Sequence, residues 1–370
     1  MSETVACRLS VSPQPGAWAV LRCRPEADLL EPLKHRPDAS TAAKSLTMLT
    51  ADSGPLLHSA FYRFVPLPDP VVVADALRRL AQGLQGSIVL ASEGINGTLA
   101  GTPELVRAFE QALQQPSVAG GVFAGMAFKH SGCVTAPFGR LKVSVKSQTV
   151  ALDLPGPSLD QTLTPHSADA HNIHDIPGTC DLQTASRDAS HLAPLAWRVL
   201  MARPDLVLLD NRNHFEYRLG HFRAAVDPQV HNFRDFVDFV QAEAPAWRAA
   251  GRPVAMYCTG GIRCDKTAPW LRSLGLEVWQ LEGGILNYFA QLADASREWQ
   301  GECFVFDKRV ALDSRLQETA RTAAQVFDAG LPDEAWRLQR AHRLDQAAPP
   351  PGLAPTPAPG NQAPETSRLK

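Results

Sequence analysis

The sequence predicts two domains in series, an α+β domain followed by an α/β domain built on a parallel sheet. The chain has 370 residues, enough for two ordinary domains with tails. Strand-like and helix-like patterns follow one another in the order β-α-β-β-α-β between residues 58 and 150. From residue 191 onward, short apolar runs alternate with helical patterns, which is typical of parallel sheets covered by helices.

The element order of the first domain predicts a ferredoxin-like fold. Thr102 and Pro103 mark the start of its second helix, as the N-cap and the first helical residue. Asn96-Gly97 favours a tight hairpin, so we expect a turn there. The expected elements are a strand over 61–65, a helix over 71–84, a strand over 87–91, the hairpin turn within 93–98, a helix over 102–113, and strands near 122–128 and 141–145.

In the second domain, two apolar strands lead into residues suited to chemistry. One ends in Asp210 and the other is followed by Cys258. The carboxyl ends of parallel strands meet at one edge of a sheet, where ligands usually bind. The expected elements are a strand over 206–209, a helix over 233–241, a strand over 254–257, a helix over 267–274, a strand over 278–281, and a turn at 283–284 followed by a helix.

Composition and the residues that interrupt helices and strands set the predicted domain boundaries. The tail from Ala347 holds seven prolines and almost no apolar bulk, so we expect it to be disordered. We divide the chain into an N-terminal extension over 1–57, expected to be poorly ordered, a ferredoxin-like domain over 58–150, a linker or insertion over 151–190, the parallel α/β domain over 191–303, a C-terminal helical extension over 304–345, and the tail over 346–370.

Composition also excludes several classes of protein. Apolar residues make up 45% and charged residues 20%, and no uncharged apolar stretch is long enough to span a membrane. The first ten residues lack the basic-then-apolar order of a secretory signal, so we expect a cytoplasmic protein without a membrane partner. Seven scattered cysteines without a C-x-x-C pair argue against a disulfide framework and a structural zinc site; we expect no metal.

Charge is unevenly distributed along the first domain. The net charge of −2 does not by itself predict a nucleic-acid partner. Between Glu110 and Asp153, however, there is no acidic residue. This basic window is either a phosphate-binding surface or a solvated strand face. Its cations are Lys129, Arg140, Lys142 and Lys146.

The richest motif is the segment from Tyr257 to Lys266, where a strand passes through a glycine-containing loop into a helix. The glycines let successive backbone N–H groups point inward, and the helix N-terminus adds to the preference for negative charge. Cys258 in such a loop has a lowered pKa and is a candidate catalytic thiolate. The opposing interpretation is a buried, inert cysteine beside a glycine-rich turn. The other loop residues are Thr259, Gly260, Gly261, Ile262 and Arg263.

The length of the loop indicates which anions it can hold. Four residues separate Cys258 from Arg263, one fewer than in cysteine phosphatases, so the loop suits a small terminal sulfur or oxygen better than phosphate. Arg263 either contacts the anion or anchors the loop to acidic neighbours. Cys264 either resolves an oxidised or persulfidated Cys258 as a disulfide, or only packs beneath the loop. Asp210 and Arg212 are expected to pair with each other or with the loop edge, in a supporting role.

At these residues the sequence resembles the tRNA uridine hydroxylase family, whose members carry a rhodanese domain. The resemblance covers about residues 58–315. It rests on the segments SEGINGT at 92–98, PFGRLKV at 137–143, CTGGIRC at 258–264 and ECFVFD at 302–307. It implies oxygen-dependent formation of 5-hydroxyuridine at the wobble position of tRNA. It further implies Cys258 as the catalytic residue, acting as thiolate or persulfide, no established cofactor, and a tRNA-docking role for the first domain.

The chain departs from the family pattern at several positions. None of these positions lies in the loop from Cys258 to Arg263. Asn211 stands where the family commonly has threonine, Pro269 falls inside the helix after the loop, and a cysteine-rich C-terminal segment is absent. Two other functions stay open. One is a rhodanese-type sulfurtransferase that carries persulfide sulfur on Cys258. The other is a non-catalytic RNA- or protein-binding module.

Overall fold

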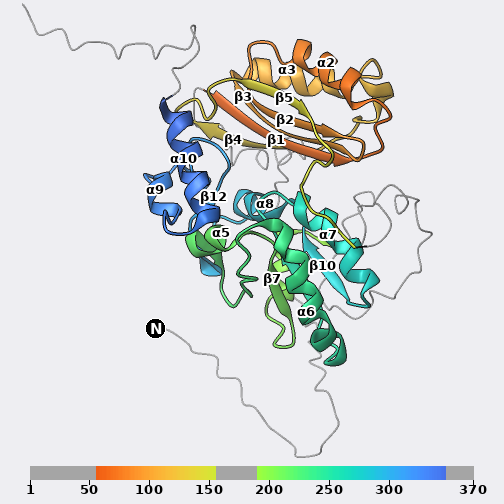
Figure 1. The fold of residues 1–370 in the computed structure, drawn as a ribbon, viewed down its shortest axis with the longest axis vertical. Helices are drawn as coiled ribbons and strands as arrows, with labels where there is room; N and C mark the ends of the chain where they lie inside the picture. The colour runs from red at the N-terminus through yellow and green to blue at the C-terminus, as the bar shows by residue number, and fades with distance from the viewer. Residues whose placement is uncertain (1–55, 156–189, 347–370) are drawn as a thin grey trace, which may run out of the picture. The chain divides into compact units, whose positions relative to one another are not determined.

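Two sheets, each with its own helices, account for most of the described chain (Figure 1). The computed structural model describes residues 56–155 and 190–346. These residues belong to one compact unit. The expectations for the N-terminal extension, most of the linker and the proline-rich tail therefore lie outside the described residues.

The first sheet has five strands in the order β4-β1-β3-β2-β5, with the helices α2 and α3 against one face (Figure 1). All pairings are antiparallel except that of β5 with β2. This confirms the predicted ferredoxin-like fold. The elements are β1 (Leu56–Phe64), α2 (Pro70–Leu80), β2 (Gln85–Ala91), β3 (Gly94–Gly101), α3 (Pro103–Leu113), a 3-10 turn (Ala119–Gly121), β4 (Phe128–Cys133) and β5 (Leu141–Val145).

The predicted turn at Asn96-Gly97 is wrong. Ser92 and Glu93 form the hairpin turn, and Asn96-Gly97 lies inside β3 opposite Tyr62 and Phe61. Packing overrides the local turn preference, because the Phe61 ring covers Gly97. A Cβ atom on Gly97 would lie 2.4 Å from the Phe61 ring.

The strand predicted near 122–128 is also wrong. The chain turns repeatedly from residue 119 to 125, because Gly120 and Gly121 before the predicted strand and Gly125 within it all have positive φ angles. The fourth strand begins only at Phe128. By contrast, the start of α3 is as predicted, with the Thr102 hydroxyl accepting the Leu105 N–H at 3.5 Å.

The second sheet is parallel throughout, as predicted, with the order β6-β10-β9-β7. The strands β7 and β9 are buried along their whole length, which explains their continuous apolar sequences. The elements are β6 (His191–Leu192), α4 (Pro194–Leu200), β7 (Val207–Asp210), α5 (His214–Leu219), β8 (Gly220–Phe222), a 3-10 turn (Phe233–Asp235), α6 (Phe236–Ala249), β9 (Val254–Tyr257), α7 (Ile262–Ser273), β10 (Val278–Leu281) and α8 (Gly284–Gln291).

The region after this sheet contains small strands as well as helices. The strand β11 pairs with β8, and β12 pairs with β13. The elements are a 3-10 turn (Ala295–Arg297), β11 (Trp299–Gly301), β12 (Cys303–Phe304), β13 (Ala311–Leu312), α9 (Ala323–Val326) and α10 (Pro332–Gln346). Over residues 56–155 and 190–346, no helix is both long and apolar enough to cross a membrane.

Candidate active site

Cys258 lies where β9 leads into α7, at the carboxyl edge of the parallel sheet. Asp210 and Tyr257, the last residues of neighbouring strands, are paired in the sheet, and Cys258 comes directly after this pair. Gly261 immediately precedes α7 with a φ angle of +100°, which side-chain-bearing residues rarely adopt. Residues 258–261 therefore fold back toward the first turn of α7, where helix N–H groups lack partners within the helix.

The loop carbonyls are held by the next helix. The N–H of Ile285 donates to the Cys258 carbonyl at 3.0 Å, and that of Leu286 donates to the Thr259 carbonyl at 3.1 Å. This close approach requires Gly284, since a Cβ atom there would lie 2.4 Å from the Cys258 carbonyl oxygen. With these carbonyls bound to α8, the loop presents N–H groups to the sulfur.

The Cys258 sulfur receives several hydrogen bonds. The Gly261 N–H donates to it at 3.1 Å. The Cys264 thiol and the backbone N–H groups of Arg263 and Cys264 also act on it as donors that lower its pKa. Burial by itself raises the pKa of Cys258, but these donors and the Arg263 charge outweigh burial and lower the pKa to about 6. The side chain is therefore mostly a thiolate at neutral pH, although it is only 1% exposed.

Arg263 is anchored by Glu216 of α5. Its Nη2 lies 3.0 Å from Glu216 Oε2, and its Nη1 donates to Oε1 at 3.1 Å. Burial opposes the charge of Arg263, but attraction to Glu216 and Cys258 raises its pKa. The guanidinium also lies 5.4 Å from the Phe233 ring and 5.5 Å from the Phe306 ring. Arg263 thus fixes the end of the loop while its charge favours the thiolate.

Cys264 lies beneath the loop and is a hydrogen-bond donor in this state. Its side chain is 1% exposed, and burial together with the neighbouring Cys258 raises its pKa well above the ordinary value. The Asn211 amide lies 3.7 Å from its sulfur. A thiol that stays protonated can donate to the Cys258 thiolate. Its role as a resolving cysteine stays a prediction.

Asp210 and Arg212 pair with each other below the loop. Arg212 Nε donates to Asp210 Oδ1 at 2.8 Å and Nη2 donates to Oδ2 at 2.6 Å, with both side chains fully buried. The Tyr257 hydroxyl donates to the same carboxylate at 2.8 Å. Although burial opposes the charge, attraction to Asp210 raises the pKa of Arg212 well above its usual value. This network supports the ends of β7 and β9.

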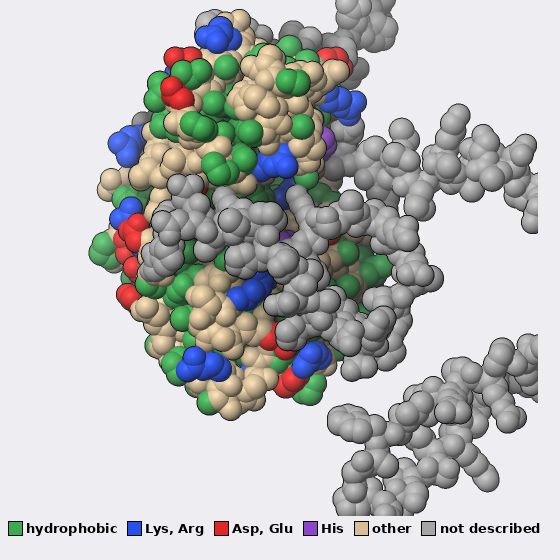
Figure 2. All heavy atoms as spheres, turned by 90° about the vertical axis from the view of Figure 1, so that its right-hand side faces the viewer, with side chains coloured by type: hydrophobic (Ala, Val, Ile, Leu, Met, Phe, Trp, Pro, Cys, Tyr) green, Lys and Arg blue, Asp and Glu red, His purple; other side chains and the backbone are tan. Residues whose placement is uncertain are grey.

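The basic window does not form one surface on the sheet. Lys129 is on β4 and Lys142 is on β5, the two opposite edges. Lys129 donates to the Gly260 carbonyl of the active-site loop. Arg140, Lys142 and Lys146 are exposed. On the face drawn in Figure 2, Lys and Arg side chains stand in separate small groups.

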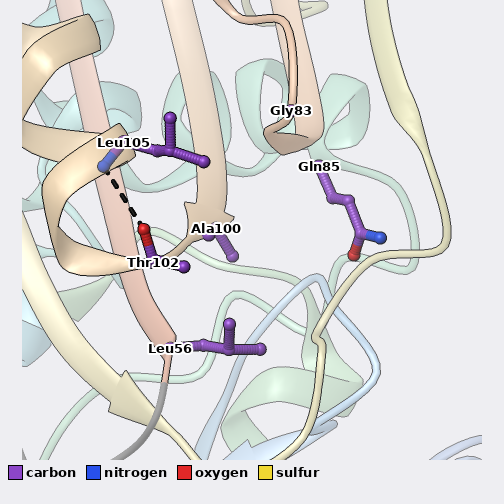
Figure 3. A pocket seen from close by; sticks show the side chains of 7 residues that line it. Leu56, Gly83, Gln85, Ala100, Thr102 and Leu105 are labelled. Atoms are coloured by element: carbon purple, nitrogen blue, oxygen red, sulfur yellow. Dashed lines mark hydrogen bonds between the residues drawn. The ribbon is translucent and has the colours of Figure 1, made fainter. Parts of the chain in front are cut away.

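The described residues show no group of three or more His, Cys, Asp or Glu side chains that could hold a metal ion. A hollow of about 220 Å³ lies in the first domain beside the start of α3 (Figure 3). Its lining is mainly apolar, and the Thr102 hydroxyl there caps α3. No residue of the Cys258 loop lines it. We therefore assign it no part in the chemistry.

Comparison with known proteins identifies the family. Two family models match, the UPF0176 acylphosphatase like domain over residues 57–149 and the Rhodanese-like domain over residues 196–291. The tRNA uridine(34) hydroxylase of Nitrobacter winogradskyi is 40% identical over 279 residues, which are 75% of this chain and 98% of that protein. That of Synechococcus elongatus is 43% identical over 260 residues, 70% of this chain and 85% of that protein. The chain belongs to the tRNA uridine(34) hydroxylase family.

Membership of the tRNA uridine(34) hydroxylase family confirms the resemblance found in the sequence. The acylphosphatase-like match covers the five-stranded sheet, and the rhodanese-like match covers most of the parallel sheet with the Cys258 loop. A solved acylphosphatase from Coxiella burnetii matches with 15% sequence identity. The matched region covers 24% of this chain and 92% of the acylphosphatase chain. The TM-score of this match is 0.18.

The sequence pattern did not single out three residues that the structure places near the loop. Glu216 is fully buried against Arg263, Tyr62 donates to Asp265 at 2.8 Å, and Phe306 is 59% exposed beside Arg263. Phe306 lies in one of the segments that carried the resemblance, ECFVFD, so it could have been singled out as an aromatic residue there. Glu216 and Tyr62 gave no local signal.

Proposed function

We propose that this chain hydroxylates C5 of uridine 34, the wobble base of tRNA, with molecular oxygen and with Cys258 as the reacting residue. The observation that carries the proposal is the Cys258 sulfur, which accepts the Gly261 N–H at 3.1 Å and whose pKa is lowered to about 6 by Cys264 and Arg263, in a chain of this family. The exposed cations Arg140, Lys142 and Lys146 supply contacts for tRNA phosphates. A tRNA substrate also favours a cytoplasmic location.

The overall reaction requires a reductant. One atom of molecular oxygen replaces hydrogen on C5 as a hydroxyl, and the other leaves as water. Two thiols supply the two electrons and two protons and become a disulfide. We propose an external thiol as this reductant, and no metal or flavin is needed for the balance.

The burial of Cys258 favours a persulfide as the reacting form. At 1% exposure, the Cys258 sulfur is poorly placed to meet a nucleobase directly. A second sulfur, transferred to the thiolate from a sulfane donor such as thiosulfate with sulfite as the leaving group, would extend the reactive atom by about 2 Å toward the loop opening. Its anion would add to C6 of the uracil ring and make C5 nucleophilic, so that C5 bonds to molecular oxygen and, with a proton, becomes a hydroperoxide. The two thiols would then reduce the O–O bond, leaving a hydroxyl on C5 and releasing water. It would leave C6 again when C5 loses its proton.

Phe306 is the residue we propose for holding a base of the anticodon loop. Its ring is 59% exposed, and its position is fixed by Phe304, 4.9 Å away at a near-right angle, and by the Arg263 guanidinium. Unpaired RNA bases stack on aromatic rings, at about 1–3 kcal/mol per base. A base held there would lie beside the loop that carries Cys258.

Replacing Phe306 tests this stacking role. We expect Phe306→Ala to weaken tRNA binding about tenfold, since one stacked base is lost. Phe306→Trp keeps an aromatic face and should bind nearly as the parent protein does. Filter binding of unmodified tRNA measures both. Equal affinity of the parent and Phe306→Ala proteins would remove Phe306 from the substrate site.

Nucleoside analysis tests the function itself. Purified protein is incubated with unmodified tRNA, thiosulfate as the sulfane donor, a thiol reductant and oxygen, and the digested nucleosides are analysed by mass spectrometry. We expect 5-hydroxyuridine at position 34, with an oxygen atom that comes from labelled molecular oxygen. Parallel samples without oxygen should show none. Unchanged 5-hydroxyuridine in the tRNA of cells that lack the gene and have no redundant pathway would reject the proposal.

A sulfurtransferase remains the second candidate, favoured by the rhodanese-like match and by the short loop between Cys258 and Arg263. This function predicts that labelled thiosulfate forms a persulfide on Cys258 and that an acceptor removes it. Intact-mass analysis follows both steps. Rapid turnover of the persulfide without any tRNA product would favour this candidate over the hydroxylase.

A further inference from the structure

The first domain contributes side chains directly to the Cys258 loop. Lys129 of β4 and Tyr62 of β1 come from adjacent strands of its sheet. Tyr62 donates to Asp265 of α7 at 2.8 Å, and Lys129 donates to the Gly260 carbonyl. The Lys129 ammonium also lies 4.7 Å from the centre of the Tyr62 ring. Two strands of one domain thus hold the loop of the other.

The peptide between Gly260 and Gly261 connects Lys129 to the catalytic sulfur. The carbonyl of this peptide accepts from Lys129, and its N–H donates to Cys258 Sγ at 3.1 Å. The peptide is trans, like every peptide bond of the described residues. In a planar trans peptide the carbonyl and the N–H point in opposite directions. Holding the carbonyl therefore sets the direction of the N–H.

Glycines on both sides make this anchor necessary. A glycine backbone turns more freely than that of any other residue, so the 260–261 peptide has a low barrier to reorientation. The φ angle of +100° disfavours a stiffer residue at Gly261, and a Cβ atom there would lie 2.7 Å from the Tyr62 hydroxyl. A cation on the carbonyl also polarises the peptide and strengthens its N–H as a donor.

We propose that Lys129 is a positioning residue for Cys258, acting through the Gly260–Gly261 peptide, and that the first domain is part of the active centre. The inference rests on the proposed function only in taking Cys258 as the reacting residue. It also reassigns Lys129, which the charge pattern placed among the phosphate-binding cations. The charged and titratable groups that face Cys258 or its immediate partners are Arg263, Cys264 and Asp265 of α7, Glu216 of α5, Cys303 of β12, the Asp210–Arg212 pair, Tyr62 and Lys129 itself, with His191 of β6 bonded to Asp265.

A thiolate titration tests the proposal without any tRNA. The ultraviolet absorbance of the Cys258 thiolate is followed against pH and corrected with Cys258→Ser protein. In the parent protein the thiolate should appear as the pH rises through about 6. Lys129→Met keeps the length of the side chain but loses the donor, so we expect the midpoint to rise by about one pH unit.

The matched control is Lys142→Met, the same substitution on β5 at the opposite edge of the sheet. Its midpoint should equal that of the parent. Lys129→Arg keeps a cationic donor and should restore most of the shift. The glutamine side chain of Lys129→Gln is too short to reach the Gly260 carbonyl, so this variant should behave like Lys129→Met. It replaces Lys129→Met in the test if that protein fails to fold. Circular dichroism checks that each variant is folded.

Two results would overturn the proposal. One is an unchanged midpoint in both folded Lys129→Met and Lys129→Gln proteins, with or without a loss of tRNA binding. The other is an equal rise in Lys129→Met and Lys142→Met proteins, which would indicate a general charge effect. If Lys129→Met raised the midpoint of the thiolate titration but the parent protein made no 5-hydroxyuridine, the positioning role would stand and the proposed function would be rejected.

Discussion

Cys258→Ser protein should form no 5-hydroxyuridine above the level of tRNA incubated without protein, a loss on the order of a thousandfold or more. A serine hydroxyl stays protonated near neutral pH, and it cannot carry a second sulfur. The surrounding donors are arranged for an anion, and at this position only the cysteine sulfur, with its pKa of about 6, provides one. Mass spectrometry of digested tRNA measures the product.

The control for this loss is a cysteine outside the loop. Burial raises the pKa of Cys133 to about 11, so it is a protonated thiol in β4. Cys133→Ala protein should retain the activity of the parent if it remains folded. Full modification of tRNA by Cys258→Ser protein would end the mechanism proposed for Cys258, while the family membership would stand. Tm values of both variants show whether a loss of activity is only a loss of folded protein.

The loop could be predicted from the sequence because its parts are adjacent in the chain. Cys258 and the Gly261 N–H that bonds its sulfur are three residues apart, and Asp210 and Arg212 are two apart. The alternation of apolar runs was also enough to predict a parallel sheet. Where a turn and a packing contact competed, as at Asn96-Gly97, local preference gave the wrong answer because the Phe61 ring determines that position.

The partners of the loop could not be predicted, because they are distant in the chain. Glu216 is 47 residues from Arg263, and Lys129 is 131 residues from Gly260. The chain has 38 acidic residues, and nothing in their pattern indicates which one meets Arg263. The charge pattern did single out Lys129, but as a phosphate contact or a solvated side chain, since a lysine that bonds a carbonyl has the same sequence signature as either of these.

Asp210→Ala should destabilise the second domain by about 3–5 kcal/mol, the cost of leaving one partner of a buried ion pair alone. Asp210 and Arg212 are both fully buried. Without the carboxylate, the Arg212 guanidinium keeps only its bond to the Gly220 carbonyl at 2.7 Å and the faces of Tyr257 and Trp299. Urea unfolding followed by tryptophan fluorescence measures this, because the first domain contains no tryptophan and Trp299 lies beside Arg212.

Comparison with an exposed ion pair shows whether burial, and not charge pairing alone, sets the cost of losing the carboxylate. Arg203 and Asp205 also form a bidentate pair, but about half of each side chain is exposed. Asp205→Ala should therefore change the unfolding free energy very little. Arg212→Met added to Asp210→Ala removes the isolated charge and should recover part of the loss. If Asp210→Ala cost no more than Asp205→Ala, the pair would not be what holds the ends of β7 and β9, and the support of the Cys258 loop would have to come from α5, α8 and the first-domain strands β1 and β4.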